Sequence, residues 1–339
     1  MKAVVYSGHR SFAIVERQLP ILEPDCATVR VLRCGITDAE LNTYLGNNPL
    51  VAVNRIPGHQ ICGIVTDVHD YGRRELIDRA VVVDPIVSCG KCARCIEGLT
   101  NRCENMEIIG THRDGGYAEY ICVPVRSLHV LPNKGSCENF SLACCLATAI
   151  HVVSRVDWSR ARSIGIWGAD TIGILVGTLL SSRGGLRFSI IDANPYRLNI
   201  ARSFGLPIWE ISSCDWDTTA IQTLCDGEDC PDTVIGNFGS PQQIGLAARM
   251  VVRGGQIIVL GGSCREVGDS LSPTVEKELT VTGCSFYTGQ EFRQSLETIT
   301  AGKFEYRTLV THRLPIEGIM EGIHILEEVT ERMHLLVSM

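Results

Sequence analysis

The sequence predicts an α/β protein with a β-rich first part and a doubly wound parallel sheet in its second part. Two observations support this prediction. Residues 1–150 read as short strand runs broken by turn residues, which is typical of a mainly β unit. From about Ser163 onward, strand runs alternate with helix runs, and this alternation with right-handed crossovers gives a parallel sheet.

The expected elements follow the apolar runs between turn residues. The first part contains strand runs at 28–32, 61–68, 79–83 and 118–123. The second part contains strand runs at 163–167, 188–191, 233–235 and 256–260 and helix runs at 171–182 and 195–204. The alternation weakens near residue 285. We therefore expect domains at 1–150 and 151–285, and a C-terminal segment, 286–339, that returns to the first domain.

Length and charge narrow the class of protein. A chain of 339 residues is too long for one ordinary core, so two domains are expected. The net charge is -7 and there is no basic stripe, so we expect no nucleic-acid partner. No apolar stretch reaches the roughly 18–20 residues that span a bilayer, and the first residues have no apolar signal core. We therefore expect a cytoplasmic protein that does not contact a membrane.

Four cysteines lie in one short run, at Cys89, Cys92, Cys95 and Cys103. The spacing C-x2-C-x2-C-x7-C lets four thiolates converge on one tetrahedral ion, and four sulfur ligands leave no open position for water. We expect one structural zinc in a metal-binding lobe that spans about residues 86–104. The chain has 16 cysteines in all, and without an export signal a reducing cytosol with free thiols is expected.

A glycine-containing loop, GADTIG (168–173), follows the strand run 163–167, and Asp192 closes the next strand run. A dinucleotide-binding Rossmann fold needs a glycine at the tight turn and another where the helix packs on the strand. Asp192 stands where an acid binds the ribose 2′-hydroxyl, which favours NAD(H) over NADP(H). The cofactor-binding candidates are Gly168, Asp170, Thr171, Ile172, Gly173, Asp192, Arg197, Leu260 and Gly261, with Arg197 expected over the adenosine.

Asp170 argues against tight nucleotide binding, because it stands where a second glycine would let the backbone approach the pyrophosphate. Two unit charges about 5 Å apart repel by roughly 3 kcal/mol at an effective dielectric of about 20. Asp is also a good helix N-cap, so its carboxylate is able to occupy the helix terminus that a phosphate would use. Two interpretations stay open: Asp170 turns to solvent and NAD(H) binds, or the fold persists with weakened nucleotide binding.

Together these motifs resemble those of the zinc-containing medium-chain dehydrogenase/reductases, in particular the bacterial polyol and sugar-acid dehydrogenase branch. The resemblance covers essentially the whole chain and also includes the segments YLGNNPLVAVNRIPGHQICGIV, GTHRDGGYAEY and KELTVTG. It implies a GroES-like catalytic domain, a Rossmann domain, a small-molecule substrate, and a homodimer or homotetramer. It also implies that Thr148 meets the nicotinamide of the cofactor.

The chain departs from this family at the catalytic zinc. Where the family has GIC-x-[ST]-D, this sequence reads GITDAE, so Thr37 aligns with a zinc-ligating cysteine and Glu40 with the aspartate that orients the ligand histidine. The family's GHE motif reads GHQ, which keeps His59, and a later Glu-Pro ligand segment aligns with Cys145 and Leu146. Because a catalytic zinc needs three protein ligands, we expect it to be absent. A residual second metal held by Cys34, His59 and Cys145 stays an open alternative.

These observations lead to one functional hypothesis and one alternative. We expect an NAD(H)-dependent oxidoreductase of the zinc alcohol dehydrogenase type that acts on a small organic substrate. Thr37, Glu40, His59 and Cys145 are the catalytic candidates, with His59 or Glu40 transferring a proton. The alternative is a non-redox enzyme (a lyase, cyclase or isomerase) or a silent binding protein on the same fold.

Overall fold

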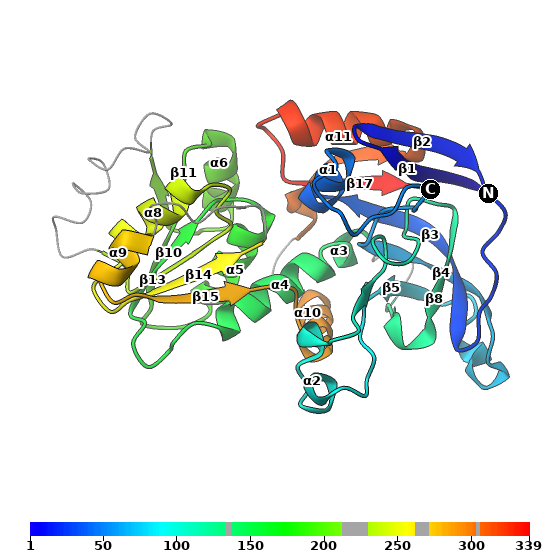
Figure 1. Cartoon of the computed structure of the whole chain (residues 1–339), viewed down its shortest axis with the longest axis horizontal. Helices are drawn as coiled ribbons and strands as arrows, with labels where there is room; N and C mark the ends of the chain where they lie inside the picture. Colours follow the sequence, from blue (N-terminus) through cyan, green and yellow to red (C-terminus); the bar gives the residue numbers. More distant parts are fainter. Residues whose placement is uncertain (133–136, 212–229, 262–270, 303–305) are drawn as a thin grey trace. The chain divides into compact units, whose positions relative to one another are not determined.

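The computed structural model describes residues 1–132, 137–211, 230–261, 271–302 and 306–339. The chain forms two compact units. The first combines Met1–Cys144 with Thr288–Met339, and the second is the continuous segment Cys145–Tyr287. The first unit therefore contains both ends of the colour scale in Figure 1, the blue N-terminal strands and the red C-terminal strand.

The first unit is β-rich. Its strands are β1 (Lys2–Gly8), β2 (Ser11–Glu16), β3 (Cys26–Ile36), β4 (Ile61–Val68), β5 (Ala80–Val83), β6 (Ile86–Val87), β7 (Glu107–Ile108), β8 (Tyr120–Pro124), β9 (Leu128–Val130), β16 (Val310–Pro315) and β17 (His334–Ser338). Its helices are α1 (Asp38–Tyr44), α2 (Ala93–Ile96), α3 (Cys137–Phe140), α10 (Gly289–Thr300) and α11 (Ile319–Glu328). Short 3₁₀ turns lie at Tyr71–Leu76, Thr100–Arg102, Val125–Ser127, Tyr306–Leu309 and Ile316–Gly318.

A seven-stranded sheet organises this unit. Its order is β16-β17-β3-β4-β5-β9, with β8 also paired to β3. The strand β17 is parallel to β16 and antiparallel to β3, so the C-terminal strand lies inside the sheet (Figure 1). Side chains alternate between the two faces of each strand. Alternate residues of β3 and β17 therefore point into the apolar core, and the residues between them lie on the opposite face of the sheet.

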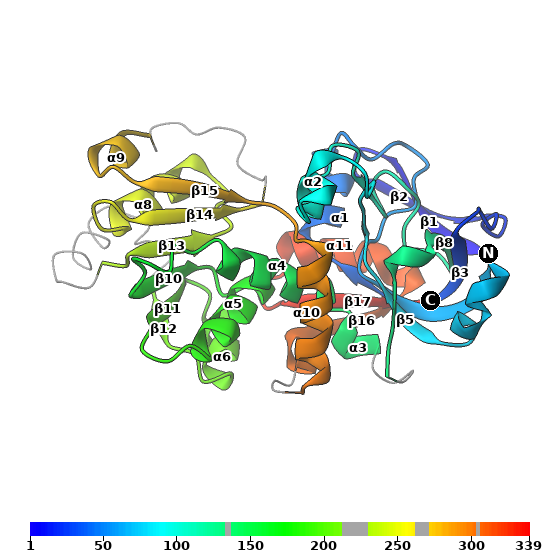
Figure 2. The same cartoon turned by 90° about the horizontal axis from the view of Figure 1, so that it is seen from below.

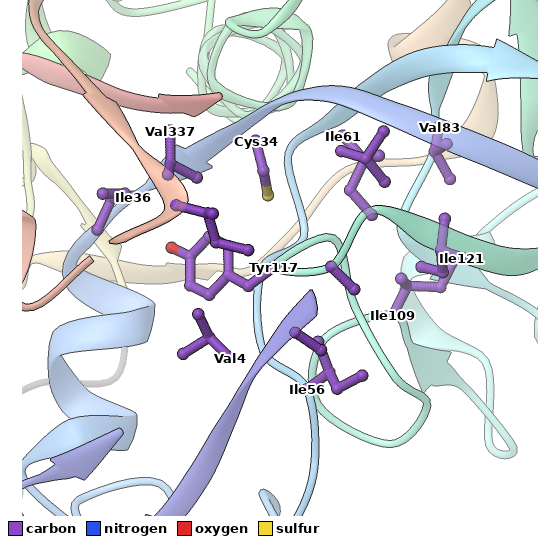
Figure 3. Close-up of a cluster of buried hydrophobic side chains, with 14 of the residues drawn as sticks. Val4, Cys34, Ile36, Ile56, Ile61, Val83, Ile109, Tyr117, Ile121 and Val337 are labelled. Atoms are coloured by element: carbon purple, nitrogen blue, oxygen red, sulfur yellow. The ribbon is translucent and has the colours of Figure 1, made fainter. Parts of the chain in front are cut away.

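The apolar core of the first unit gathers side chains from strands far apart in the sequence. Cys34 and Ile36 of β3, Val337 of β17 and Tyr117 pack together in Figure 3. The hydroxyl of Tyr117 donates a hydrogen bond of 2.9 Å to the carbonyl of Gly35, which satisfies the one polar atom of this buried ring. This core fixes the end of β3, from which α1 begins.

The second unit contains a six-stranded parallel sheet. Its strands are β10 (Ser163–Trp167), β11 (Arg187–Asp192), β12 (Ile208–Glu210), β13 (Thr233–Gly236), β14 (Gln256–Leu260) and β15 (Thr280–Cys284). Its helices are α4 (Ala143–Ser154), α5 (Thr171–Ser181), α6 (Pro195–Ser203), α8 (Pro241–Met250) and α9 (Leu271–Glu276). The first two residues of α4 belong to the first unit and the rest to the second. Figure 2 shows the spatial order β15-β14-β13-β10-β11-β12. Every neighbouring pair is parallel.

This sheet has the strand order 3-2-1-4-5-6 that defines a dinucleotide-binding Rossmann sheet. The order reverses between β10 and β13, and ligands of such sheets bind outside the carboxyl ends of the strands at that point. The predicted fold class, a β-rich domain with a doubly wound parallel sheet, is confirmed. None of the helices in the described residues is long and apolar enough to cross a bilayer.

Candidate active site and metal site

The four clustered cysteines meet at one point in the first unit. Their sulfur atoms all lie within 4.8 Å of one another. The Sγ atoms of Cys89 and Cys95 are 3.9 Å apart, and those of Cys92 and Cys103 are 4.0 Å apart. Zinc–sulfur bonds of about 2.3 Å in a tetrahedron separate the sulfurs by roughly 3.8 Å. The cluster therefore fits a structural zinc.

Backbone N–H groups around α2 point at these sulfurs. The N–H of Cys89 donates to Sγ of Cys103 at 3.2 Å, and that of Cys92 donates to Sγ of Cys89 at 3.4 Å. Backbone hydrogen bonds from Lys91 and Cys92 lower the pKa of Cys89 to about 6. The thiolate, which is the form that binds zinc, is therefore accessible at neutral pH for this ligand.

The second cluster begins where β3 ends. Thr37 is the N-cap of α1, and its hydroxyl oxygen accepts a hydrogen bond of 3.2 Å from the N–H of Ala39. Glu40 completes a capping box, because its carboxylate accepts 2.9 Å from the N–H and 2.7 Å from the hydroxyl of Thr37. Glu40 is only 3% exposed, so these hydrogen bonds hold a buried carboxylate in one orientation.

His59 completes this cluster from the neighbouring strand. It lies two residues before β4, which is antiparallel to β3 with Ile61 opposite Cys34. Nδ1 of His59 is 2.7 Å from Oε1 of Glu40. Glu40 therefore joins Thr37 and His59, and this contact does not use the Nε2 atom of His59.

The charges of this pair stabilise each other. Burial acts to lower the pKa of His59, but the charge and hydrogen bond of Glu40 outweigh burial and raise it above the ordinary histidine range. Burial acts to raise the pKa of Glu40, but His59 and the hydrogen bonds from Thr37 keep it below the ordinary range. At neutral pH the pair is therefore a carboxylate next to an imidazole with increased proton affinity.

These residues do not fit a catalytic zinc. Thr37 is not a zinc-type ligand and donates its hydroxyl to Glu40, whose carboxylate is already bonded to Thr37 and His59. The contact of Nδ1 of His59 with Glu40 leaves Nε2, which is a single imidazole ligand. In the part of the chain that the structure describes, the four-cysteine lobe is the one group of three or more His, Cys, Asp or Glu side chains placed to hold a metal. A catalytic zinc needs three protein ligands, which this arrangement does not supply.

Cys34 does not join the Thr37–Glu40–His59 cluster as a ligand. Cys34 is 0% exposed and belongs to the apolar core with Ile36 and Val337 (Figure 3). Burial, with a smaller effect of the charge of Glu40, raises the pKa of the Cys34 thiol well above its ordinary value. Cys145 lies on α4 as the first residue of the second unit.

The predicted nucleotide residues gather at the carboxyl edge of the parallel sheet. Gly168 follows β10, Asp192 ends β11, and Leu260 ends β14 with Gly261 after it. Gly168 has a φ of +102° and open space where a Cβ would stand. At Gly173, a Cβ would lie 2.0 Å from the carbonyl oxygen of Gly168, so only glycine permits this close packing of α5 on the loop.

Asp170 caps α5, as expected for an aspartate at this position. Its Oδ1 accepts a hydrogen bond of 2.8 Å from the N–H of Gly173. Thr171 and Ile172 follow in the first turn of α5, where backbone N–H groups have no carbonyl acceptor within the helix and are suited to a phosphate oxygen. Asp170 therefore takes one donor of this helix N-terminus and places a negative charge beside the others.

Asp192 and Arg197, the residues expected on the adenosine side, lie at the end of β11 and in α6. Asp192 accepts hydrogen bonds from the N–H of Ala169 at 2.7 Å and from that of Asn194 at 2.8 Å. Asn194 caps α6, which carries Arg197 in its first turn. The Nε atom of Arg197 is buried and lacks a hydrogen-bond partner among the described residues. This orphaned donor and the N-terminus of α5 fit a dinucleotide. Thr148 lies half-buried on α4.

The sequence interpretation missed His334, the first residue of β17. It is 3% exposed, and burial, followed by the charge of His59, lowers the pKa of His334 to about 4. Its only signal in the sequence is a histidine that opens the apolar run HLLVS. That signal is weak, because the pairing that brings His334 close to His59 joins strands about 300 residues apart.

Comparison with known proteins identifies the family. Residues 23–133 match the alcohol dehydrogenase GroES-like domain, and residues 171–301 match the zinc-binding dehydrogenase domain. Together these matches span well over half of the chain. The chain belongs to the zinc-containing medium-chain dehydrogenase/reductase family. The predicted family and the predicted GroES-like and Rossmann domains are therefore confirmed, and this dehydrogenase is an oxidoreductase.

Individual relatives agree with this assignment. The dehydrogenase is 27% identical over 323 residues to L-galactonate-5-dehydrogenase of Escherichia coli K12, an alignment that covers 95% of this chain and 94% of the relative. A short-chain alcohol dehydrogenase of Escherichia coli CFT073, solved with NADH, has 22% identity and a TM-score of 0.89 over 100% and 99% of the two chains. A putative zinc-binding dehydrogenase of Sinorhizobium meliloti, bound to NADP, has 22% identity and a TM-score of 0.87 over 100% and 99%. The similarity to these two solved structures, at 22% identity, shows a shared fold.

Proposed function

We propose that this protein is an NAD(H)-dependent oxidoreductase that acts on a small organic substrate without a catalytic zinc. The observation that carries the proposal is the Thr37–Glu40–His59 cluster, in which a buried carboxylate is hydrogen-bonded to both the hydroxyl of Thr37 and the imidazole of His59. NAD(H), when bound, accepts or supplies the hydride. His59, held by Glu40, exchanges the proton.

The raised proton affinity of His59 sets the direction in which this pair works best. In its protonated form, which the charge of Glu40 favours, the imidazole donates a hydrogen bond, and then a proton, from Nε2 to a carbonyl oxygen that is being reduced. In the opposite direction His59 must be neutral before it can accept the proton of a hydroxyl. The oxidation rate is therefore expected to rise with pH through the pKa of His59.

Cofactor choice follows from the carboxyl edge of the parallel sheet. Asp192 ends β11 where a ribose 2′-hydroxyl binds, so NAD(H) is preferred to NADP(H). The cofactor contacts assigned to Thr148, Gly168, Asp170, Thr171, Ile172, Gly173, Asp192, Arg197, Leu260 and Gly261 are part of this proposal. One zinc, bound in the four-cysteine lobe, is the only metal that the proposal includes.

Titration with NADH and with NADPH tests the proposal most directly. We expect saturable binding of NADH, followed by nicotinamide fluorescence and by a shift in melting temperature, and weaker binding of NADPH. Absence of binding of either nucleotide would contradict an oxidoreductase that uses them. It would favour the non-redox alternative, which the carboxylate of Asp170 at the helix N-terminus already supports.

Substrate assignment can begin from the relative named for L-galactonate. We propose small polyhydroxylated acids as the first class to test, with NAD⁺ reduction followed at several pH values. Activity that survives removal of loosely bound metal by a chelator, in protein that keeps one zinc per chain, would agree with a metal-free reaction centre. Activity that needs a second zinc would contradict it.

We also propose a cytoplasmic homodimer or homotetramer. The strand β15 is paired with β14 alone among the described strands, and Val281 on it is 50% exposed. Such an open edge recruits a second sheet unless it is protected. A reducing compartment is proposed because the four-cysteine lobe must keep its thiolates to bind zinc.

A further inference from the structure

His334 is a buried polar side chain that the Glu40–His59 pair does not use. It is 3% exposed, and its Nε2 atom is buried without a hydrogen-bond partner among the described residues. Leaving such an atom unsatisfied is costly, so native proteins rarely keep one without a reason. The orphaned Nε2 therefore points to a bound group that completes its hydrogen bonding.

Strand pairing places His334 beside the site. In the antiparallel pair of β17 and β3, Leu335 lies opposite Ile36 and Val337 opposite Cys34. All four belong to the apolar core, part of which Figure 3 shows. Because side chains alternate along a strand, His334 lies on the other face of the sheet, next to the end of β3 where Thr37 begins α1.

The same face carries the chain next to His59. Gly35 lies opposite Leu336, and a Cβ at Gly35 would stand 2.1 Å from Oε1 of Gln60. The side chain that follows His59 in sequence therefore covers β3 on this face. His59, Gln60 and His334 thus approach the end of β3 from two neighbouring strands.

The charge state of His334 follows from these surroundings. Burial and the charge of His59 lower its pKa to about 4, and Glu40 acts in the opposite direction. At neutral pH His334 is therefore a neutral imidazole within electrostatic reach of both Glu40 and His59. A neutral imidazole has one N–H donor and no net charge to be solvated.

We propose that His334 is a second catalytic imidazole, whose Nε2–H donates a hydrogen bond to the same substrate oxygen that exchanges a proton with His59. The inference rests on the proposed function and deepens it. Two imidazole donors would polarise the carbonyl in place of a metal ion. A neutral histidine is able to act as such an electrophile, and preorganised donors of this kind are worth about 10²–10³ in kcat each.

The step balances in the direction of reduction. The carbonyl carbon receives the hydride that NADH supplies, and the π electron pair of the C=O bond moves onto the oxygen. His59 transfers its Nε2 proton to that oxygen and becomes neutral. His334 keeps its proton throughout and stabilises the negative charge that develops on the oxygen.

Two variants separate the hydrogen bond from packing. His334→Leu removes the donor, whereas His334→Gln places an amide N–H₂ near the position of Nε2. Isobutyramide, an amide that cannot be reduced, is titrated into the protein saturated with NADH. We expect His334→Leu to weaken its binding by about tenfold or more, and His334→Gln to bind it almost as the unmodified protein does. Leu336→Met, on the same strand face, serves as the matched control, and NADH affinity should be the same in all four proteins.

The outcomes distinguish this inference from the proposed function. If the unmodified protein binds no NADH, the proposed function fails, and the inference fails with it. If NADH binds but isobutyramide does not, or binds equally to His334→Leu, only the role of His334 is overturned. Should His334→Leu not fold, ¹⁵N spectra of the unmodified protein decide. A neutral ring protonated at Nε2 agrees with the proposal, and one protonated at Nδ1 overturns it.

Discussion

Glu40 and Asp170 are carboxylates that each cap a helix, and each stands beside a group that function requires. Glu40 accepts hydrogen bonds from Thr37 and from His59, so one side chain both begins α1 and tunes the proton affinity of an imidazole. Asp170 caps α5 at the terminus where a phosphate would bind. At the residue scale, local helix capping and site chemistry therefore use the same atoms.

Glu40→Gln tests the coupling within the pair. The amide keeps the shape and an oxygen that accepts from His59, but it removes the negative charge. We expect the pKa of His59 to fall, because the charge of Glu40 outweighs burial in raising it. Oxidation, which needs neutral His59, should then begin at lower pH. An NMR titration of the His59 ring measures the shift. Asp38→Asn, which neutralises an exposed carboxylate of the same helix, should leave the pKa of His59 unchanged. An unchanged pKa of His59 in Glu40→Gln would show that the pair is not coupled.

Asp170→Gly and Asp170→Asn separate the two effects of Asp170 on nucleotide binding. Both remove a charge that repels a phosphate about 5 Å away by roughly 3 kcal/mol, and Asn keeps the helix cap. If charge dominates, both variants should bind NADH about tenfold or more tightly, as measured by nicotinamide fluorescence. If occupation of the N–H of Gly173 dominates, only Asp170→Gly should gain. Equal affinity in all three proteins would mean that the carboxylate faces away from the phosphates.

Much of the residue-scale picture is readable from the sequence, and its limit is physical. Residue type and spacing predict the cap at Asp170, and the family resemblance predicts the partnership of Glu40 with His59. His334 could not be found in this way, because its neighbours come from β17 pairing with β3 across almost the whole chain. The missing hydrogen-bond partner of Nε2 of His334 is also a property of side-chain packing, which composition and periodicity do not reveal.

At the scale of elements, the four-cysteine lobe differs from the strands around it. It contains the short helix α2 and a 3₁₀ turn, with no buried residue in either. Such a segment cannot be held by apolar packing, so metal coordination must supply most of its stability. The parallel strands, in contrast, are held by a continuous apolar core and backbone pairing.

Metal analysis tests this division of roles. We expect one zinc per chain in the purified protein and its loss in Cys95→Ser, with a lower melting temperature, because three ligands hold the ion less tightly and the lobe has little packing of its own. Cys122→Ser changes a cysteine outside the lobe and should keep the zinc. Two tightly bound zincs per chain would contradict the absence of a catalytic metal, and none would contradict the structural site.

The sequence predicts elements best where periodicity is strong. The runs predicted at 163–167, 61–68 and 256–260 coincide with β10, β4 and β14. Bounds shift by a residue or more elsewhere: the run at 28–32 becomes the longer β3, because strand length is set by pairing with β4, β8 and β17 together. A local apolar pattern indicates which residues are buried. The register and length of a strand depend on the strands that pair with it, and these lie elsewhere in the sequence.

At the scale of the whole molecule, the open edge of the parallel sheet allows assembly. Val281→Lys places a charge on the outer face of β15, which is the usual way in which proteins protect an edge strand. We expect this variant to have a lower mass than the unmodified protein in light scattering after gel filtration. Tyr71→Lys, at a site that is 76% exposed in the first unit, is the control. Equal masses for all three proteins would exclude this edge as the contact between copies.

The interior position of β17 also constrains how the chain is made. A ribosome releases Cys145–Tyr287 as one continuous stretch, so the second unit is able to fold while translation continues. The first unit must wait, because its sheet lacks the interior strand between β16 and β3 until residues 334–338 emerge. Nascent chains arrested shortly before residue 334 should therefore resist protease in the nucleotide-binding half and be cleaved in the half that carries His59. A chain that ends before residue 334 would accordingly keep a folded Rossmann unit but lack the strand that pairs with β3 beside the proposed proton-transfer residues.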